Sequence, residues 1–194
     1  MEFRLIYRGS LKSNGSPEEK QAIRRQFHPQ LKKLWGEKPL CGYAETKKPP
    51  EGYIDTSLNY LDENAETNVV YPISNFKFAC LINERLQLHA ELDILFLRPE
   101  PIGHIIHTGG DIDNRLKTLF DGLRRPILSN EIPKDDFPKS GENPFHCLLS
   151  DDALISKVTV ATDQLLDATT SDEIVLIVHT RIKSHQLEQF YFIS

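Results

Sequence analysis

The chain has 194 residues, of which 39% are hydrophobic and 26% are charged, and this composition is typical of a globular protein rather than a disordered or fibrous one. It contains no apolar run of 18 residues, so we expect no membrane span. Its first residues lack a basic region followed by an apolar segment, so we expect no secretory signal. The three cysteines, Cys41, Cys80 and Cys147, form no C-x-x-C pair, which favours reduced thiols and a cytoplasmic location.

The net charge of −5 is unevenly distributed along the chain. Residues 1–50 carry 11 Lys and Arg against 5 Asp and Glu, a net of +6. Residues 51–110 carry 3 Lys and Arg against 9 Asp and Glu, and residues 111–194 carry 9 against 14. Both later parts of the chain are therefore acidic. A basic N-terminal quarter is compatible with contacts to a phosphate backbone, and equally with solvated helix faces.

The first elements predicted are a short strand over residues 3–8 and a helix that begins at Pro17. Ser16 is suited to cap that helix, and Pro17 to occupy its first position. Its apolar side chains recur at helical spacing, whereas a second set of residues is basic and is expected to face solvent (Arg24, Arg25, Lys32, Lys33). Pro29 predicts a kink or a restart of the helix.

Residues 36–75 are rich in proline and polar residues and are expected to form a long irregular connection. Two strands are then predicted, over residues 76–82 and 86–97, with a turn at 83–85 between them. In the second strand apolar and polar residues alternate, which predicts one buried and one partly polar face.

A helical pattern covers residues 111–125, and residues 126–147 contain four prolines and resemble an inserted loop. Strands are predicted over residues 153–161 and 174–182. Strands before, between and after two helices indicate an α+β (mixed α/β) fold, with a mixed sheet and two main helices packed on it, in a single domain of residues 1–194.

The start of the second helix carries the first candidate site, Asp111-Ile-Asp113-Asn114. Taken alone, Asp111 suits a helix N-cap and Asp113 its first turn. Lys117 lies one turn after Asp113 on the same face, so a cation would point to where two carboxylates converge. A calcium-binding EF-hand loop has Gly at its sixth position and Glu at its twelfth. Counted from Asp111, these positions are Leu116 and Gly122, so the spacing does not fit an EF-hand.

The second candidate site is the pair Asp151-Asp152, which precedes a predicted strand and by itself suits a polar turn. If one of these acids joins Asp111 and Asp113, each pair of carboxylates at about 4 Å repels by roughly 4 kcal/mol at an effective dielectric near 20. Such a cluster needs protons or a cation, and oxygen ligands select Mg²⁺ or Mn²⁺ over zinc. Asp135-Asp136 is a rival source of the third ligand, although no strand follows it.

Together the two motifs resemble those of the RusA family of Holliday-junction resolvases. Residues 111–123 match the pattern D-x-D-N-x-x-K-x-x-x-D-A-L, with Gly122 in place of the alanine, and residues 149–155 match a Leu-x-Asp-Asp-Ala-hydrophobic segment. The early strand, Ser13-Asn14 and a basic helix precede the motifs in an order similar to that of the family. The chain departs from the family in its length, its acidity and its insertions at about 36–75 and 126–147.

This resemblance implies a RusA-like fold and a magnesium-dependent endodeoxyribonuclease that acts on branched DNA such as a four-way junction. Asp111, Asp113 and Asp152 would hold Mg²⁺ with help from Asp151. Lys117 would contact the scissile phosphate. The family acts as homodimers, so a homodimer is expected here.

Two other classes of protein remain open from the sequence. One is a catalytically weak or inactive nucleic-acid-binding protein that keeps the fold, and the other is a nucleotide-sugar transferase with a D-x-D motif. His104 and His107 lie three residues apart, so on an extended segment they would point to opposite faces and would not form a metal site. Arg124 and Arg125 are expected at the surface, where contact with a DNA backbone is the alternative role. Three aromatic residues could stack on bases, although packing in the protein is favoured for each (Tyr7, Trp35, Tyr43).

Overall fold

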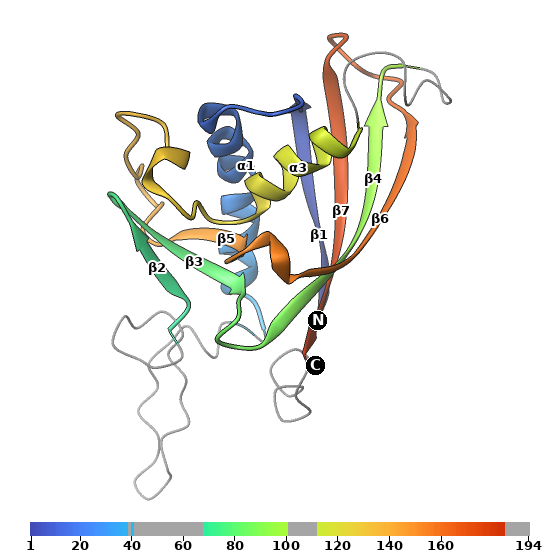
Figure 1. The fold of residues 1–194 in the computed structure, drawn as a ribbon. Helices are drawn as coiled ribbons and strands as arrows, with labels where there is room; N and C mark the ends of the chain where they lie inside the picture. Colours follow the sequence, from blue (N-terminus) through green and yellow to red (C-terminus); the bar gives the residue numbers. More distant parts are fainter. Residues whose placement is uncertain (39, 41–67, 101–111, 185–194) are drawn as a thin grey trace, which may run out of the picture.

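The fold was analysed in a computed structural model, which describes all residues except 39, 41–67, 101–111 and 185–194 (Figure 1). The described elements are β1 (Glu2–Ser10), α1 (Pro17–Trp35), β2 (Val70–Ile73), β3 (Phe76–Ile82), β4 (Leu88–Arg98), α3 (Ile112–Leu123), η1 (Ser129–Glu131), β5 (Phe145–Leu149), η2 (Asp152–Leu154), β6 (Ile155–Gln164) and β7 (Glu173–Ser184). The α+β prediction is therefore confirmed.

The strands form two sheets rather than one. One sheet has the order β1-β7-β4-β6, in which β4 and β6 run parallel and the other pairs antiparallel. The second has the order β2-β3-β5, with β3 and β5 parallel. In Figure 1 the helices α1 and α3 lie between the two sheets. The sequence pattern predicted the other five strands, but β2 and most of β5 fall in segments that were expected to be irregular.

Helix α1 begins as predicted, because Ser16 and Glu19 form a reciprocal capping box and Pro17 occupies the first turn. The predicted restart at Pro29 is wrong, since the helix continues to Trp35. Tyr7 and Trp35 are both buried, which confirms packing rather than base stacking, and Tyr43 lies outside the described residues.

The basic side chains of α1 do not all face solvent, contrary to expectation. Arg24 is 1% exposed. Arg25 pairs with Asp136 at 2.8 Å and with Glu142 at 3.1 Å, and Lys32 donates to the Gly141 carbonyl at 2.7 Å. Arg25 and Lys32 thus bind the acidic segment 126–147 against α1.

Gly122 lies where α3 packs most tightly against α1. A Cβ atom at this position would lie 2.4 Å from Cγ2 and 2.9 Å from Cβ of the buried Ile23. We expect Gly122→Ala to destabilise the protein by about 1–3 kcal/mol through overpacking, although alanine is the better helix former. Urea unfolding monitored by the fluorescence of the single tryptophan, Trp35, measures this change. Gly36→Ala, outside that interface, is the control, and an equal effect of both changes would contradict the prediction.

Two buried histidines join α1 to β5. The backbone N–H of His146 donates to Nδ1 of His28 at 2.9 Å, so Nε2 of His28 carries the hydrogen and donates to the Gly141 carbonyl at 3.2 Å. Burial, with the nearby charges of His28 and Lys32, lowers the pKa of His146 to about 4. Burial also lowers the pKa of His28.

This pair predicts a loss of stability in mild acid. Because the folded pKa of His146 lies below its unfolded value of 6.5, the unfolded chain binds the proton first as pH falls. The contribution is complete above pH 6.5 and declines toward pH 4, by about 2 kcal/mol between pH 7 and pH 5. Urea unfolding at both pH values should show that His146→Leu removes this part of the pH dependence. The same pH dependence in both proteins would contradict the prediction.

Within the part of the chain that the structure describes, no helix is long and apolar enough to cross a membrane.

Candidate functional site at the junction of the two sheets

The candidate site is built around two short segments that cross from one sheet to the other. Residues 83–87 connect β3 to β4, and residues 150–154 connect β5 to β6. The two segments are neighbours, because the N–H of Ser150 donates to the Ile82 carbonyl at 2.9 Å and its Oγ donates to Glu84 at 2.5 Å. The C-terminal end of α3 joins them through the N–H of Arg125, which donates to the Leu149 carbonyl at 2.9 Å.

Helix α3 presents its predicted polar face beside this junction. Asp113 is exposed in the first turn, where its Oδ1 accepts the N–H of Asn114 at 2.7 Å, and Lys117 is exposed one turn later. Asp111 lies outside the described residues, as do His104 and His107. The burial of Leu119 and Leu123 orients the helix, which leaves Asp113 and Lys117 accessible to a ligand.

Asp151 and Asp152 lie in residues 150–154, the segment that connects β5 to β6. Oδ1 of Asp151 accepts the N–H of Ala153 at 2.8 Å and so caps η2. The side chain of Asp152 is 44% exposed, and its Oδ1 lies 3.9 Å from Nε of Arg124. The predicted strand that starts at Ala153 begins two residues later, at Ile155.

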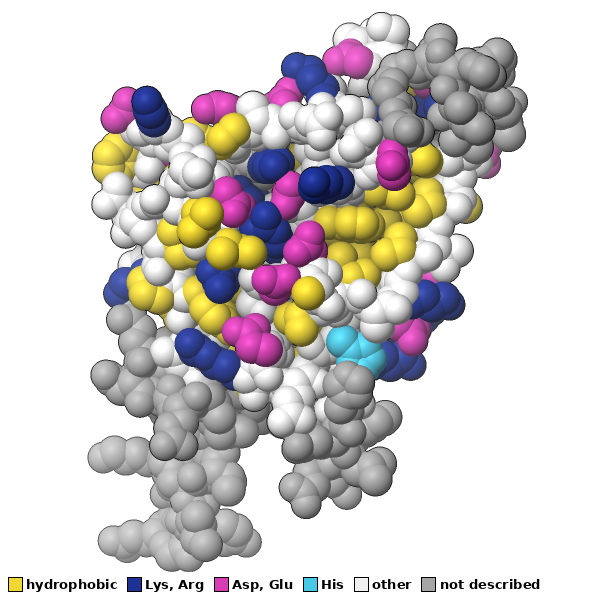
Figure 2. All heavy atoms as spheres, in the orientation of Figure 1, with side chains coloured by type: hydrophobic (Ala, Val, Ile, Leu, Met, Phe, Trp, Pro, Cys, Tyr) yellow, Lys and Arg dark blue, Asp and Glu magenta, His cyan; other side chains and the backbone are white. Residues whose placement is uncertain are grey.

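Asp121 and Arg124 form a network of charged groups behind these acids. Asp121 accepts from Nζ of Lys20 at 2.8 Å and from Arg124 at 2.6 Å, and Arg124 also binds Glu131 at 2.8 Å. Burial raises the pKa of the Asp121 carboxyl, but the hydrogen bond from Lys20 and the charge of Arg124 outweigh it, so the net shift is downward. Figure 2 shows acidic and basic side chains interspersed on this face, beside a hydrophobic area over β4 and β6.

The chemistry of these donors fits a hard divalent cation. Asp113, Asp151 and Asp152 offer exposed or partly exposed carboxylate oxygens on two elements that contact each other, α3 and η2. Within the described residues no three His, Cys, Asp or Glu side chains form a group that could hold a metal ion, and Asp111 lies outside that set. The carboxylates of Asp113, Asp151 and Asp152 are thus of a type that suits Mg²⁺, but they do not form a ligand group by themselves.

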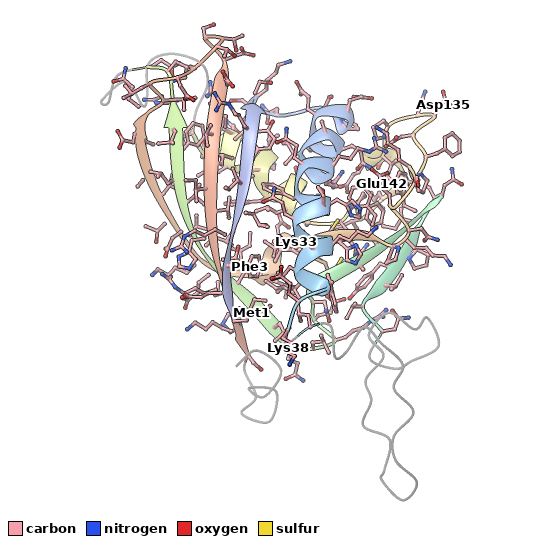
Figure 3. All side chains as sticks on the ribbon, turned by 180° about the vertical axis from the view of Figure 1, so that it is seen from behind. Met1, Phe3, Lys33, Lys38, Asp135 and Glu142 are labelled. Atoms are coloured by element: carbon pink, nitrogen blue, oxygen red, sulfur yellow. The ribbon has the colours of Figure 1, made fainter. Side chains whose placement is uncertain are left out.

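The rival acids lie in a different part of the molecule. Asp136 binds Arg25 of α1 at 2.8 Å, and Asp135 is exposed in the inserted segment with a φ of 61°. Figure 3 labels Asp135 near the tip of that segment, beside α1. Asp136 thus has a cationic partner on α1, and this ion pair holds the inserted segment against the helix.

Sequence reasoning missed most of the charged network. Lys20 and Glu131 reach Asp121 and Arg124 from segments far away in the chain, and no local pattern indicates such a meeting. The expected surface position of Arg124 is wrong, because its side chain is only 10% exposed. One signal was available: Asp121 and Arg124 share the helix face that carries Asp113 and Lys117.

Compared with known proteins, the chain matches no protein-family model, no curated protein and no solved structure. The likeness to the RusA family therefore rests on the residues of the two motifs alone.

Proposed function

We propose that this protein is a magnesium-dependent endonuclease that hydrolyses phosphodiesters in branched DNA, as a resolvase of four-way junctions does. The observation that carries the proposal is that the two motifs lie on elements that contact each other, α3 and η2. The helix that bears Asp113 and Lys117 contacts η2, which bears Asp152, and oxygen-only ligands of this kind suit Mg²⁺.

In this proposal Asp111, Asp113 and Asp152 hold the metal ion, with Asp151 in support. When bound, Mg²⁺ or Mn²⁺ would supply an activated water and polarise the phosphoryl oxygen. Lys117 is exposed on the same helix face as Asp113, where its ammonium group can contact the scissile phosphate and stabilise developing charge. A homodimer, also proposed, would place two such sites on two strands of one junction.

The test is cleavage of a synthetic four-way junction by the purified full chain with Mg²⁺ or Mn²⁺. We expect products in the presence of either ion and none in EDTA. Asp152→Asn should abolish cleavage, whereas Asp135→Asn should leave it unchanged and so serves as the matched control. A protein that is inert on junctions, flaps and single strands with both metal ions would refute the proposal.

A protein that binds nucleic acid without turnover is the second candidate, and one observation favours it. Nε of Arg124 is buried, without a hydrogen-bond partner, and lies 3.9 Å from Asp152, so it competes with a metal ion for that carboxylate. This candidate predicts a gel shift of the junction that needs no metal and is unaffected by Asp111→Asn. Cleavage of the junction by the purified chain with Mg²⁺ or Mn²⁺ would exclude it.

A further inference from the structure

Arg85 and Arg125 form a cationic cluster at the junction of the two sheets. Both guanidinium groups lie over the ring of Tyr71, with their central carbons 4.7 Å and 4.4 Å from its centroid. Tyr71 is 8% exposed, so its ring is fixed in the protein and presents a rigid face to the two side chains. We refer to these three residues as the arginine stack.

The two arginines of the stack differ from most cations of the fold, because within the described residues neither forms a salt bridge. Lys20, Arg24, Arg25 and Arg124 all lie within 4.0 Å of a carboxylate. Arg85 instead donates to the backbone and side chain of Asn68, and Arg125 donates to the Pro126 carbonyl at 3.0 Å. Within the described residues both guanidinium groups thus donate to carbonyl and amide oxygens rather than to a carboxylate.

The neighbouring acid, Glu84, accepts its side-chain hydrogen bonds from hydroxyl groups, and the charge of Arg125 also acts on it. Its two carboxylate oxygens accept from Tyr71 at 3.2 Å and from Ser150 at 2.5 Å. Burial raises the pKa of Glu84, but these hydrogen bonds outweigh it, and the net shift is downward. Glu84 therefore anchors Tyr71 under the stack, and the cluster keeps a net charge of +1.

The stack is continuous with the candidate active site. Arg125 follows Arg124, whose Nε faces Asp152, and Glu84 is bonded to Ser150, which precedes Asp151. The positive stack and the acidic pair thus share one surface at the junction of the two sheets. A DNA strand with one phosphate at Asp151 and Asp152 would bring a neighbouring phosphate to the arginine stack.

We propose that Arg85 and Arg125 form a phosphate-binding subsite that holds the DNA backbone next to the scissile bond, an inference that rests on the proposed function. Guanidinium groups match phosphate oxygens in planar geometry, and stacking on Tyr71 reduces the conformational freedom that binding removes. The basic residues of α1 are unsuited to this role, because most are paired within the molecule.

The test measures binding of the full chain to a fluorescent four-way DNA junction with Mg²⁺, in an Asp113→Asn background that prevents turnover. Each phosphate contact contributes about 0.9 to the slope of log K against log salt. Arg85→Gln/Arg125→Gln should therefore lower the magnitude of the slope by about 2 and weaken binding by about 10- to 100-fold near 0.1 M NaCl.

Two further variants separate this contact from general electrostatics. Arg85→Lys/Arg125→Lys keeps both charges and should retain most of the slope. Arg4→Gln/Lys157→Gln removes the same charge from the outer face of the four-stranded sheet, where both residues are exposed, and should leave the slope unchanged. Thermal unfolding of each variant verifies that it is folded.

The outcomes distinguish this inference from the proposed function. An unchanged slope in the glutamine variant, or an equal loss in the outer-face control, would overturn the subsite while leaving nuclease activity to its own test. Binding that depends on the stack in a protein that cleaves no junction would support the subsite and refute the nuclease. If the Asp113→Asn protein with Arg85 and Arg125 unchanged binds no junction, both the subsite and the proposed function are refuted.

Discussion

Asp113→Asn is expected to reduce cleavage of a four-way junction by more than about 100-fold while binding persists. Loss of a group that merely supports a metal ligand commonly costs about 10–100-fold, so loss of a ligand itself should cost more. Asparagine keeps the volume and can still accept the N–H of Asn114, and Asp113 is exposed, so the fold does not depend on its charge. Single-turnover cleavage and a binding titration on the same protein preparation measure the two effects.

Asp163→Asn is the matched control for this change. Asp163 is also exposed, and its Oδ1 accepts the N–H of the next residue at 2.7 Å, the same distance as in Asp113. Asp163 lies in β6, outside the proposed site, so its substitution tests the loss of an exposed carboxylate by itself. Cleavage by Asp113→Asn at the rate of the parent protein would remove this carboxylate from the mechanism, whatever its effect on binding.

Arg24→Met is expected to lower the free energy of unfolding by about 3–5 kcal/mol, the largest effect on stability that we predict. The buried guanidinium of Arg24 donates from Nε to the Arg124 carbonyl at 2.9 Å and from Nη2 to the Asp121 carbonyl at 2.8 Å. These carbonyls end α3, where no further helical turn can satisfy them. Methionine fills similar space but leaves both without a donor, which adds a desolvation penalty.

Arg25→Met is the comparison for this prediction, since it makes the same substitution at the next residue. The side chain of Arg25 is 22% exposed and its ion pairs with Asp136 and Glu142 are only partly buried, so we expect a smaller cost than at Arg24, about 1–2 kcal/mol. Urea unfolding followed by Trp35 fluorescence measures both variants. Similar costs at the two positions would show that the carbonyls at the end of α3 find other donors.

Local patterns predicted the elements whose signals lie within a few residues. Ser16, Pro17 and Glu19 determine the start of α1, and the alternation in residues 88–98 determines β4 and its buried face. The helix face that bears Asp113 and Lys117 also followed from spacing alone. In each case the physical cause is a backbone hydrogen bond or a side-chain period that the neighbouring residues decide.

Strands β2 and β5 were not predictable in this way. Each is short, and β5 is buried along its whole length, so it shows no alternation of polar and apolar residues. Both exist because β3 pairs with them on either side, and that pairing joins residues more than 60 positions apart for β5.

The chain by itself therefore determined the α+β class, most strands, both described helices and the acidic motifs that open the candidate site. The tertiary structure decided which charges meet. It buried Arg24, paired Asp136 with Arg25 of α1, and placed Arg85 and Arg125 over Tyr71. Contacts of this kind depend on how elements distant in sequence pack, and no local period or capping rule contains that information.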